Sequence, residues 1–339
     1  MLKMQTINAG DIVGLEGVAR LAAETHGFSD AAELELFTLT ENATYRVSEA
    51  GRTPIVLRVY RPASRPAIEI QSELAWMRAL RTDLGPVVPN ILAGLDGSQL
   101  VEVIPSSGTP TCFCVAMSLA PGSEPREDEL ATWFPRLGEI TARFHQHARG
   151  WTPPNWFSRP TWDVATSLGD RPHWGHWYAS VPDPEERTQL QRLADVVAAR
   201  LERFGASPAR FGLVHADLRI ANLVADGDAI QAIDFDDCGF SWYLYDLACA
   251  LTFLEARDDA DDLIASWVDG YRKIASMPAD DEAEIPTLLM LRRLLISSYV
   301  GLRPDIGMAH ELAANGYNAE TCTLAETYLG RFDTNRGDR

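Results

Sequence analysis

Two short apolar runs that each end in carboxylates constrain this 339-residue chain more than any other feature. The first run leads into His215-Ala216-Asp217, and an asparagine follows five residues after the aspartate. The second run ends in Ile233-Asp234-Phe235-Asp236, and Asp226-Gly227-Asp228 between the runs is a typical hairpin turn. We expect this hairpin to bring three polar side chains to one end: Asp217, Asn222 and Asp234.

These three side chains suit phosphoryl transfer. Carboxylate and amide oxygens are ligands that Mg²⁺ prefers, so Asp234 and Asn222 are candidate metal ligands. Asp217 would then be free to act on a hydroxyl group, and phosphoryl transfer demands charge neutralisation and positioning. Each residue alone has a simple structural explanation, because Asp and Asn commonly form turns after strands. Their joint spacing is far more specific than any one of them.

The first third of the chain predicts a small sheet around one helix. β-branched and aromatic residues between turn signals indicate strands. They cover residues 34–40, 44–48, 54–60, 100–104 and 113–119. Apolar residues at helical spacing predict the helix over residues 68–81.

After residue 122 the pattern changes to helices. They are predicted over residues 130–148, 185–204, 260–274, 288–300 and 320–332. Residues 211–240 indicate loops and short strands. We therefore expect a smaller β-rich lobe, residues 1–118, and a larger helical lobe, residues 119–339. Pro121-Gly122 is a candidate hinge, and active sites favour such interfaces.

Composition excludes several partners and sites. A formal net charge of −18 repels nucleic acid and anionic membranes, and it is compatible with a cationic substrate. We find no apolar run of about eighteen residues in the sequence, so no membrane-spanning helix is expected. The first residues lack the apolar core of a secretory signal. We therefore expect a cytoplasmic location. The five cysteines contain no Cys-x-x-Cys pair, which argues against a disulfide framework or a zinc site. Nothing in the sequence indicates an oligomeric state.

Lysine is almost absent from the chain. Lys3 and Lys273 are the only lysines among 30 basic residues. Neither lies in a Walker A motif or in a Ser-x-x-Lys motif, so P-loop nucleotide hydrolases and serine–lysine hydrolases are excluded. A phosphate clamp in this chain must be built from arginine or from backbone amides.

The pattern over residues 215–236 resembles the aminoglycoside phosphotransferase and choline kinase superfamily, which has a protein-kinase-like fold. Tyr245-Asp246-Leu247-Ala248 resembles its downstream Asp-Leu-Ala element. Residues 40–47 and 57–62 resemble the nucleotide-covering hairpin and the base-carrying strand of the homoserine-kinase-like and stress-response-kinase-like branch. The resemblance spans residues 35–255 and implies a bilobal α+β fold. It implies a small antiparallel β-sheet with one main helix in the N-lobe, and a larger, mostly helical C-lobe.

The resemblance implies roles for the residues of the hairpin region. Asp217 is the catalytic base or orients the acceptor hydroxyl, while Asn222 and Asp234 hold Mg²⁺. Asp246 is expected to brace the loop that carries Asp217, which we call the catalytic loop. His215 is expected to support this loop through hydrogen bonds, and Arg219 could touch the γ-phosphate of ATP or face solvent.

The resemblance also implies an ATP site in the small lobe. Arg58 takes the position of the superfamily's phosphate-binding lysine, and Glu73 is its expected partner. Arginine differs from lysine in reach and geometry. Arg61 and Arg65 are further candidate phosphate contacts. Other implied nucleotide contacts lie on the covering hairpin and on the segment where adenine would sit: Glu41, Asn42, Thr44, Tyr45, Met117 and Leu119.

Three features lie outside these motifs. Ala216 stands where small-molecule kinases of the superfamily usually have glycine, which costs little unless the backbone needs a positive φ. We interpret the aromatic residues between positions 151 and 178 as anchors of an irregular segment rather than as a cage for an amine. The acidic runs 255–262 and 280–284 are typical of solvated faces, although in the superfamily acidic residues of this lobe can contact amines.

Three functions follow from these observations. The first is an ATP-dependent phosphotransferase that acts on a hydroxyl of a small molecule, such as an amino alcohol, a hydroxy amino acid or an aminoglycoside-like compound. The second is a Ser/Thr protein kinase of the stress-response type, although no separate activation segment follows Asp234. The third is a nucleotide-binding scaffold of low turnover, which Arg58 supports and the intact hairpin residues oppose.

Overall fold

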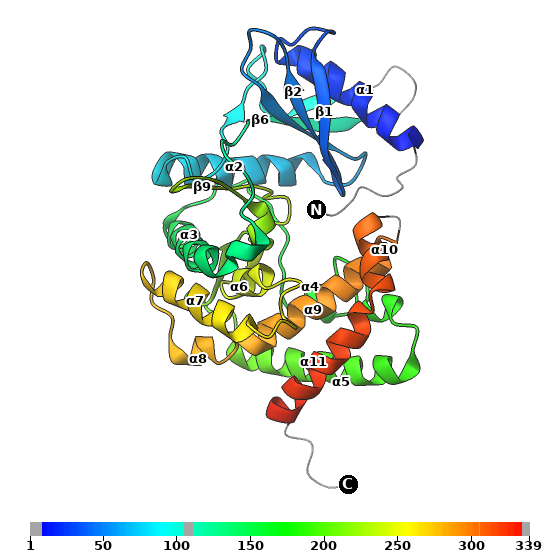
Figure 1. Cartoon of the computed structure of the whole chain (residues 1–339), viewed down its shortest axis with the longest axis vertical. Helices are drawn as coiled ribbons and strands as arrows, with labels where there is room; N and C mark the ends of the chain where they lie inside the picture. The colour runs from blue at the N-terminus through cyan, green and yellow to red at the C-terminus, as the bar shows by residue number, and fades with distance from the viewer. Residues whose placement is uncertain (1–8, 105–110, 305, 334–339) are drawn as a thin grey trace.

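The structure is a computed structural model that describes residues 9–104, 111–304 and 306–333, with side chains from residue 14. Figure 1 shows two lobes stacked along the long axis. The smaller lobe holds an antiparallel sheet in the order β1-β2-β3-β6-β4, with β5 also paired to β6. Its strands are β1 (Glu33–Leu39), β2 (Asn42–Ser48), β3 (Ile55–Tyr60), β4 (Ile91–Leu92), β5 (Val101–Val103) and β6 (Cys112–Ser118). This arrangement confirms the predicted strands and adds the short β4.

The register of the sheet places Arg58 at its centre. In β3, Arg58 pairs with Thr44 of β2 on one side and with Val115 of β6 on the other. Successive side chains of a strand point to opposite faces. In β2, Tyr45 and Val47 are buried, whereas Thr44 and Arg46, which flank Tyr45, are partly exposed. The sheet therefore has one face toward its own core and one face available to a ligand.

Two helices flank the sheet. The first, α1 (Ala9–Thr25), was not predicted, because three glycines inside it weaken its helix propensity. It is stabilised by packing, since Leu15, Val18 and Ala22 are buried in a core shared with the sheet. The second, α2 (Ala67–Leu84), contains the predicted helix and lies between the sheet and the larger lobe (Figure 1).

The larger lobe is mostly helical, as expected. All predicted helices of this lobe are present, and the shorter ones were not predicted. The α-helices are α3 (Leu130–Gly150), α4 (Val164–Leu168), α5 (Pro184–Phe204), α6 (Tyr245–Ala250), α7 (Ala260–Arg272), α8 (Ala279–Glu282), α9 (Ile285–Leu302), α10 (Gly307–Ala314) and α11 (Tyr317–Phe332). The 3-10 turns are η1 (Glu127–Glu129), η2 (Trp177–Ser180) and η3 (Ile220–Asn222).

Glycine permits the close packing of α3 against α7. A Cβ atom at Gly138 would lie 2.1 Å from the carbonyl oxygen of Trp267, and one at Gly270 would lie 1.9 Å from that of Pro135. Any larger residue at either position would push the two helices apart. Helix α3 of this pair packs against β7, the strand that leads into the site.

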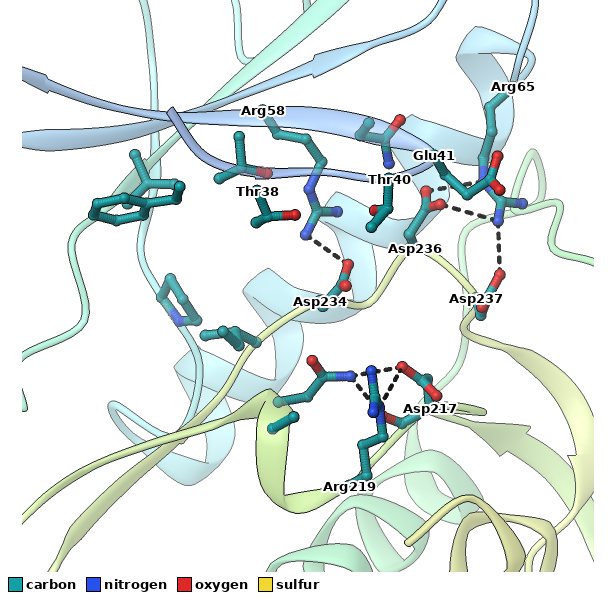
Figure 2. Close-up of a pocket in the computed structure, with 18 of the residues that line it drawn as sticks. Thr38, Thr40, Glu41, Arg58, Arg65, Asp217, Arg219, Asp234, Asp236 and Asp237 are labelled. Carbon is teal, nitrogen blue, oxygen red and sulfur yellow. Dashed lines mark hydrogen bonds and ion pairs between the residues drawn. The ribbon is translucent and has the colours of Figure 1, made fainter. Parts of the chain in front are cut away.

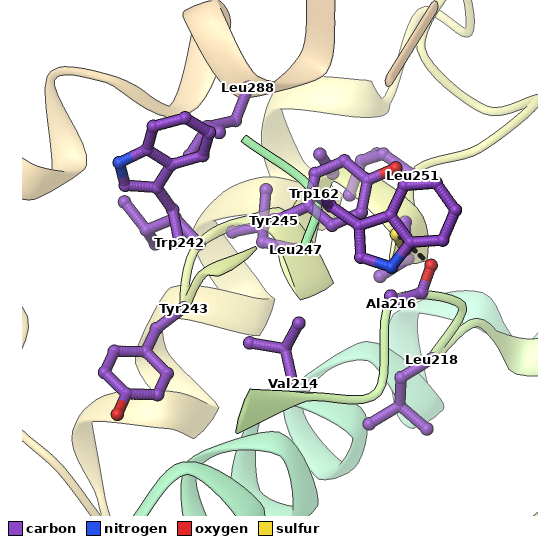
Figure 3. Close-up of a cluster of buried hydrophobic side chains, with 14 of the residues drawn as sticks. Trp162, Val214, Ala216, Leu218, Trp242, Tyr243, Tyr245, Leu247, Leu251 and Leu288 are labelled. Carbon is purple, nitrogen blue, oxygen red and sulfur yellow. Dashed lines mark hydrogen bonds between the residues drawn. The ribbon is translucent and has the colours of Figure 1, made fainter. Parts of the chain in front are cut away.

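Two antiparallel strand pairs lie between the helices. One is β7 (Phe211–Val214) with β10 (Gly239–Trp242), and the other is the hairpin of β8 (Leu223–Asp226) and β9 (Ala229–Ala232). Figure 3 shows Ala216 and Leu218 of the loop after β7 within a cluster of buried side chains that includes Trp162 and Tyr245. The loop therefore sits on a packed core.

The segment that connects the two lobes, at Gly122 and Ser123, contacts the β8–β9 hairpin. Gly122 has a φ of 102°, and a Cβ atom there would lie 1.9 Å from the carbonyl oxygen of Ala225. Ser123 and Ala225 exchange backbone hydrogen bonds of 3.0 and 2.9 Å. This position requires glycine for both its conformation and its close approach. The division of the chain at residues 118 and 119 stays a prediction.

One stretch of the described chain is long and apolar enough, by length and composition, to cross a membrane, although none was predicted from the sequence. It is Ala279–Leu302, with a mean hydropathy of 1.3, and 78% of it is buried inside the protein. It includes α9, which is therefore a core helix of the larger lobe. All five cysteines are also buried.

Candidate active site

A cavity of about 1070 Å³ lies between the lobes. The small-lobe sheet forms one wall, and the catalytic loop, the β8–β9 hairpin and α9 form the other. Figure 2 shows two arginines of the small lobe, Arg58 and Arg65, reaching toward carboxylates of the larger lobe. Domain interfaces of this kind are common positions for ligand sites.

The predicted hairpin is present and has the predicted consequence. The N–H of Ile233 donates to the carbonyl oxygen of Asn222 at 2.9 Å, so Asn222 and Asp234 lie at the same end of the hairpin. Nδ2 of Asn222 donates to the backbone oxygen and to Oδ2 of Asp217, at 2.8 and 2.7 Å. All three polar residues line the cavity.

Asp246 holds the catalytic loop by its backbone. Its carboxylate accepts the N–H groups of His215 at 3.1 Å and of Ala216 at 2.7 Å. Nε2 of His145, on α3, lies 3.0 Å from the same carboxylate. Burial lowers the pKa of His145, although Asp246 acts in the opposite direction. These contacts match the bracing role expected for Asp246.

His215 joins the two apolar runs without entering the cavity. Its side chain is buried, and Nε2 lies 3.1 Å from the carbonyl oxygen of Ile233. Nδ1 lies 3.3 Å from the backbone nitrogen of Asp217, and the ring lies 4.3 Å from that of Phe235. These contacts support the loop, as expected, and His215 is not among the residues that line the cavity.

The backbone at Ala216 corrects one expectation. Its φ is 65°, so this is the case in which alanine is unfavourable relative to glycine. The left-handed region costs a residue with a Cβ atom roughly 1–2 kcal/mol. The carbonyl oxygen of Ala216 accepts from Sγ of Cys249 at 2.9 Å, and Figure 3 shows this contact at the base of the loop. Asp234 has a similar φ of 64°, so both chain reversals of the site are held in this conformation.

Three side chains contact the Asp217 carboxylate. Its Oδ1 accepts from Nη2 of Arg292 at 2.7 Å, and its Oδ2 accepts from Asn222. Nε of Arg219 lies 3.5 Å from Oδ2, and the Arg219 side chain lines the cavity. Arg292 was not predicted from the sequence as a site residue. The sequence feature that could have indicated it is the pair Arg292-Arg293 inside the apolar helix α9, because a buried charge needs a partner.

Arg58 occupies the position expected of the phosphate-binding base. Its Nη1 donates to Oε1 of Glu73 at 2.8 Å, which confirms the expected pairing, and its Nη2 donates to Oδ1 of Asp234 at 3.0 Å. Burial lowers the pKa of Arg58, but Tyr60, Glu73 and Asp234 more than offset this and raise it well above its ordinary value. Burial raises the pKa of Glu73, and Arg58 opposes that rise. The guanidinium is therefore a fixed positive charge facing the cavity.

Arg65 spans the cleft to two adjacent carboxylates. Its Nε lies 2.9 Å from Oδ1 of Asp236, and its Nη2 lies 2.9 Å from Oδ1 of Asp237. Burial acts to raise the pKa of Asp236, but Arg65 and Arg58 outweigh it and hold this pKa below its ordinary value. Burial raises the pKa of Asp237 to about 7, against the effect of Arg65 and with the help of Asp236. Arg61 instead donates to the carbonyl oxygen of Thr40 and does not line the cavity.

The implied nucleotide residues fall into two groups. Tyr45 is a correction: its side chain is 2% exposed in the core of the small lobe, whereas the neighbouring Thr44 and Arg46 line the cavity. The alternation of side chains along β2 turns Tyr45 away. Glu41 also contacts Arg303 of the larger lobe across the cleft. The implied residues that do line the cavity are Glu41, Asn42, Thr44, Met117 and Leu119.

The aromatic segment has a second role besides anchoring. Trp177 is buried, as an anchor should be, but Trp162 and Trp174 also line the cavity. Their ring centroids lie 5.0 Å apart, and Trp174 lies 5.7 Å from Tyr299 of α9. These three aromatic rings form one side of the cavity near Asp217.

The two acidic runs do not reach the cavity. Glu255 is buried against Arg293, and Asp281 pairs with Arg210. Neither run contributes a residue to the cavity lining. Among the acidic side chains that do line the cavity are Asp237 and its neighbour Asp236.

The donor set at the hairpin fits a hard divalent cation. In the part of the chain that the structure describes, no group of three or more His, Cys, Asp or Glu side chains could hold a metal. Nδ2 of Asn222 is committed to Asp217, which leaves the amide oxygen for a cation. The Asp234 side chain is 49% exposed and lines the cavity. One amide and one carboxylate oxygen are enough for Mg²⁺, which usually keeps waters and phosphate oxygens as its other ligands.

Comparison with known proteins agrees with this geometry. Residues 34–283 match the phosphotransferase enzyme family. Amicoumacin kinase of Bacillus subtilis (strain 168) is 26% identical over 292 residues, which is 83% of each chain. The solved structure of a microcompartment-associated aminopropanol kinase is 39% identical, with a TM-score of 0.85 over 93% of this chain and 98% of that chain. A solved amicoumacin kinase in complex with AMP-PNP, Ca²⁺ and Ami has a TM-score of 0.75 at 22% identity, over 93% of this chain and 96% of that chain.

The fold and the site define a bilobal phosphotransferase with a protein-kinase-like architecture. The chain belongs to the phosphotransferase enzyme family. It is a kinase that transfers a phosphoryl group to a hydroxyl of a small molecule.

Proposed function

We propose that this enzyme transfers the γ-phosphoryl group of ATP to the hydroxyl of a short amino alcohol, with Mg²⁺ as the divalent cation. The observation that carries the proposal is the 39% identity to an aminopropanol kinase across 93% of this chain. The cavity supports it, because acidic and aromatic side chains surround the candidate base.

In this proposal the nucleotide would bind against the small-lobe wall of the cavity. Met117 and Leu119 would contact the adenine, and Thr44 lies on the strand that covers the phosphates. Arg58 would hold the phosphates, and arginine can do so through two parallel hydrogen bonds. Asn222 and Asp234 would hold Mg²⁺, which supplies neutralisation of the phosphate charge.

Asp217 acts on the acceptor. The acceptor oxygen bonds to the γ-phosphorus as the bond from that phosphorus to the bridging oxygen of ADP breaks. The hydroxyl proton leaves toward the Asp217 carboxylate, which lines the cavity. Arg219, beside Asp217, can stabilise the charge on the transferred group.

An ammonium group of the acceptor fits the far side of the same cavity. Asp237 supplies a carboxylate there, and Trp174 and Tyr299 supply aromatic faces. Cations are attracted to aromatic faces as well as to carboxylates. Asp237 is therefore our candidate for the residue that selects amino alcohols over plain alcohols.

A protein substrate is less favoured by the geometry. From Asp234 the chain reaches β10 at Gly239 and α6 at Tyr245. This leaves no long segment on which a peptide could dock.

The proposal is tested with purified enzyme, ATP and Mg²⁺ against a panel of acceptors. The panel contains 1-amino-2-propanol, ethanolamine, a hydroxy amino acid, an aminoglycoside and the matched alcohol without an amino group. Mass spectrometry detects compounds that gain one phosphoryl group. We expect the short amino alcohols to be phosphorylated with the highest kcat/KM and the matched alcohol with the lowest.

Two variants test the assigned base. Asp217→Asn should lower kcat by roughly 100-fold or more, because general base catalysis contributes about 10²–10⁴-fold. Asp228→Asn, at the exposed turn of the same hairpin, is the matched control and should keep the wild-type rate. Preferred phosphorylation of the aminoglycoside, or of protein added to the reaction, would contradict the proposed acceptor.

A further inference from the structure

Two consecutive arginines of α9 are both buried and both ion-paired. Arg292 is 3% exposed and Arg293 is 0% exposed. Arg293 points toward α11, where it contacts Thr321 and Glu320. Arg292 points the other way, into the catalytic loop. Two buried charges side by side are costly, and each is retained only with strong partners.

Arg292 contacts the catalytic loop and the two segments behind it. Its Nη2 donates to Oδ1 of Asp217 at 2.7 Å, and its Nη1 lies 3.4 Å from the carbonyl oxygen of Ala216. The same Nη1 donates to Oη of Tyr245 at 3.1 Å, and Nε donates to Oγ1 of Thr252 at 3.1 Å. The guanidinium therefore joins the catalytic loop, through Asp217, to Tyr245 of α6 and to Thr252 in the chain after α6.

These contacts hold the Asp217 carboxylate from two sides. Arg292 occupies one position on Oδ1, and Asn222 occupies one position on Oδ2. Rotation of the carboxylate would break at least one of these 2.7 Å hydrogen bonds. An ionised carboxylate has about four acceptor positions, so positions remain for the acceptor hydroxyl. Arg292 also contacts the strained residue Ala216 that precedes Asp217.

We propose that Arg292, whose side chain is 4% exposed at the cavity wall, is a positioning residue for phosphoryl transfer: its hydrogen bond to Oδ1 orients the Asp217 carboxylate toward the acceptor hydroxyl. This inference rests on the role proposed above for Asp217. Arginine suits the task, because its planar fork makes several hydrogen bonds in fixed directions, which lysine cannot do.

The test compares Arg292→Lys and Arg292→Gln with the wild type, using whichever acceptor the wild-type enzyme phosphorylates best. A misplacement of about 1 Å at a reacting group can cost about 100-fold. We therefore expect kcat to fall roughly 100-fold in Arg292→Gln and less in Arg292→Lys. The apparent KM for ATP should change by less than about threefold, because the nucleotide contacts are untouched.

Arg293 offers a matched control for loss of folding. Arg293→Gln removes a buried, paired arginine from the same helix and should lower the melting temperature, yet keep kcat within about threefold, because the hydrogen bonds and ion pairs that the structure gives Arg293 go to Glu255 and to α11. A loss of kcat in Arg293→Gln equal to that in Arg292→Gln would overturn the proposal. So would a wild-type kcat in both Arg292 variants.

Milder variants keep the test open if Arg292→Gln does not fold. Tyr245→Phe combined with Thr252→Val removes the hydrogen bonds of Arg292 to α6 and the chain after it, together with the 3.5 Å hydrogen bond from Thr252 to the carbonyl oxygen of Ala248, and should lower kcat roughly tenfold at unchanged KM for ATP. Guanidinium ion added to Arg292→Ala should restore part of the lost kcat; rescue of Arg293→Ala to the same degree would contradict the proposal. A different preferred acceptor overturns the proposed function but leaves this comparison valid.

Discussion

The side chains of Arg58 and Asp234 meet across the cleft, with Nη2 of the arginine 3.0 Å from Oδ1 of the aspartate. Arg58 is fixed on the sheet by Glu73 of α2, and Asp234 ends the second apolar run. The contact joins the candidate phosphate-binding cation to a candidate metal ligand. It also ties the two lobes at the point where the γ-phosphate would lie.

Arg58 should be necessary for both stability and nucleotide binding. Arg58→Met leaves Glu73 buried without its partner, and breaking a buried pair costs about 3–5 kcal/mol. We also expect the KM for ATP to rise at least about tenfold, while Arg58→Lys has a smaller effect because it keeps the charge. Urea denaturation and initial rates measure the two effects. Arg20→Met, in an exposed pair with Glu16, is the control and should change stability by less than about 1 kcal/mol. A wild-type KM in Arg58→Met would remove Arg58 from the nucleotide site.

The divalent cation should depend on the end of the hairpin. We expect EDTA to abolish activity and Mg²⁺ to restore it. Asp234→Asn should raise the Mg²⁺ concentration needed for half-maximal rate by about tenfold or more, because it removes a charged oxygen ligand. Asp226→Asn, at the other end of the hairpin, should leave this concentration unchanged. Equal Mg²⁺ dependence in both variants would contradict the assigned metal ligand.

The pH dependence should report on Asp237. Burial raises the pKa of this carboxyl to about 7, so it becomes negatively charged as the pH rises through that value. An aliphatic ammonium has a pKa of about 10 and stays positive over this range. We expect the KM for an amino alcohol to fall as the pH rises from about 6 to about 8, and Asp237→Asn to flatten this profile. The matched alcohol without an amino group corrects for the titration of ATP. A profile that is the same for both alcohols would rule out an ammonium contact at Asp237.

The backbone at position 216 gives a graded test of the loop. Ala216→Gly relieves the strain of a Cβ atom at a φ of 65°, about 1–2 kcal/mol, against about 0.4–1 kcal/mol of added unfolded-state entropy, so it should keep kcat and leave the melting temperature equal to or slightly above the wild type. Ala216→Val places a β-branched residue in this conformation and in a fully packed core, so we expect a loss of more than about 2 kcal/mol and a reduced kcat. Thermal unfolding and initial rates provide the comparison. Equal stability of the valine variant would show that the loop adopts another conformation.

The sequence alone determined the local parts of the site. The apolar runs, the turn at residues 226–228 and the spacing of Asn222 and Asp234 predict a hairpin whose ends meet, because strand pairing and turn chemistry act between neighbouring residues. The scarcity of lysine excluded a P-loop and pointed to arginine as the phosphate contact. The longer helices and the strands of the first lobe followed from the same short-range periodicity.

Tertiary structure decided the rest. Arg292 reaches Asp217 from 75 residues away, and no local pattern encodes such a contact. Tyr45 faces the core because α1, which propensity alone did not reveal, covers that side of the sheet. The positive φ of Ala216 and the placement of Trp174 and Asp237 in the cavity likewise depend on segments that are far apart in the sequence and meet only in the folded chain. Sequence patterns report which residues are buried within an element, whereas the orientation of a catalytic carboxylate depends on which distant side chains the packed core brings to it.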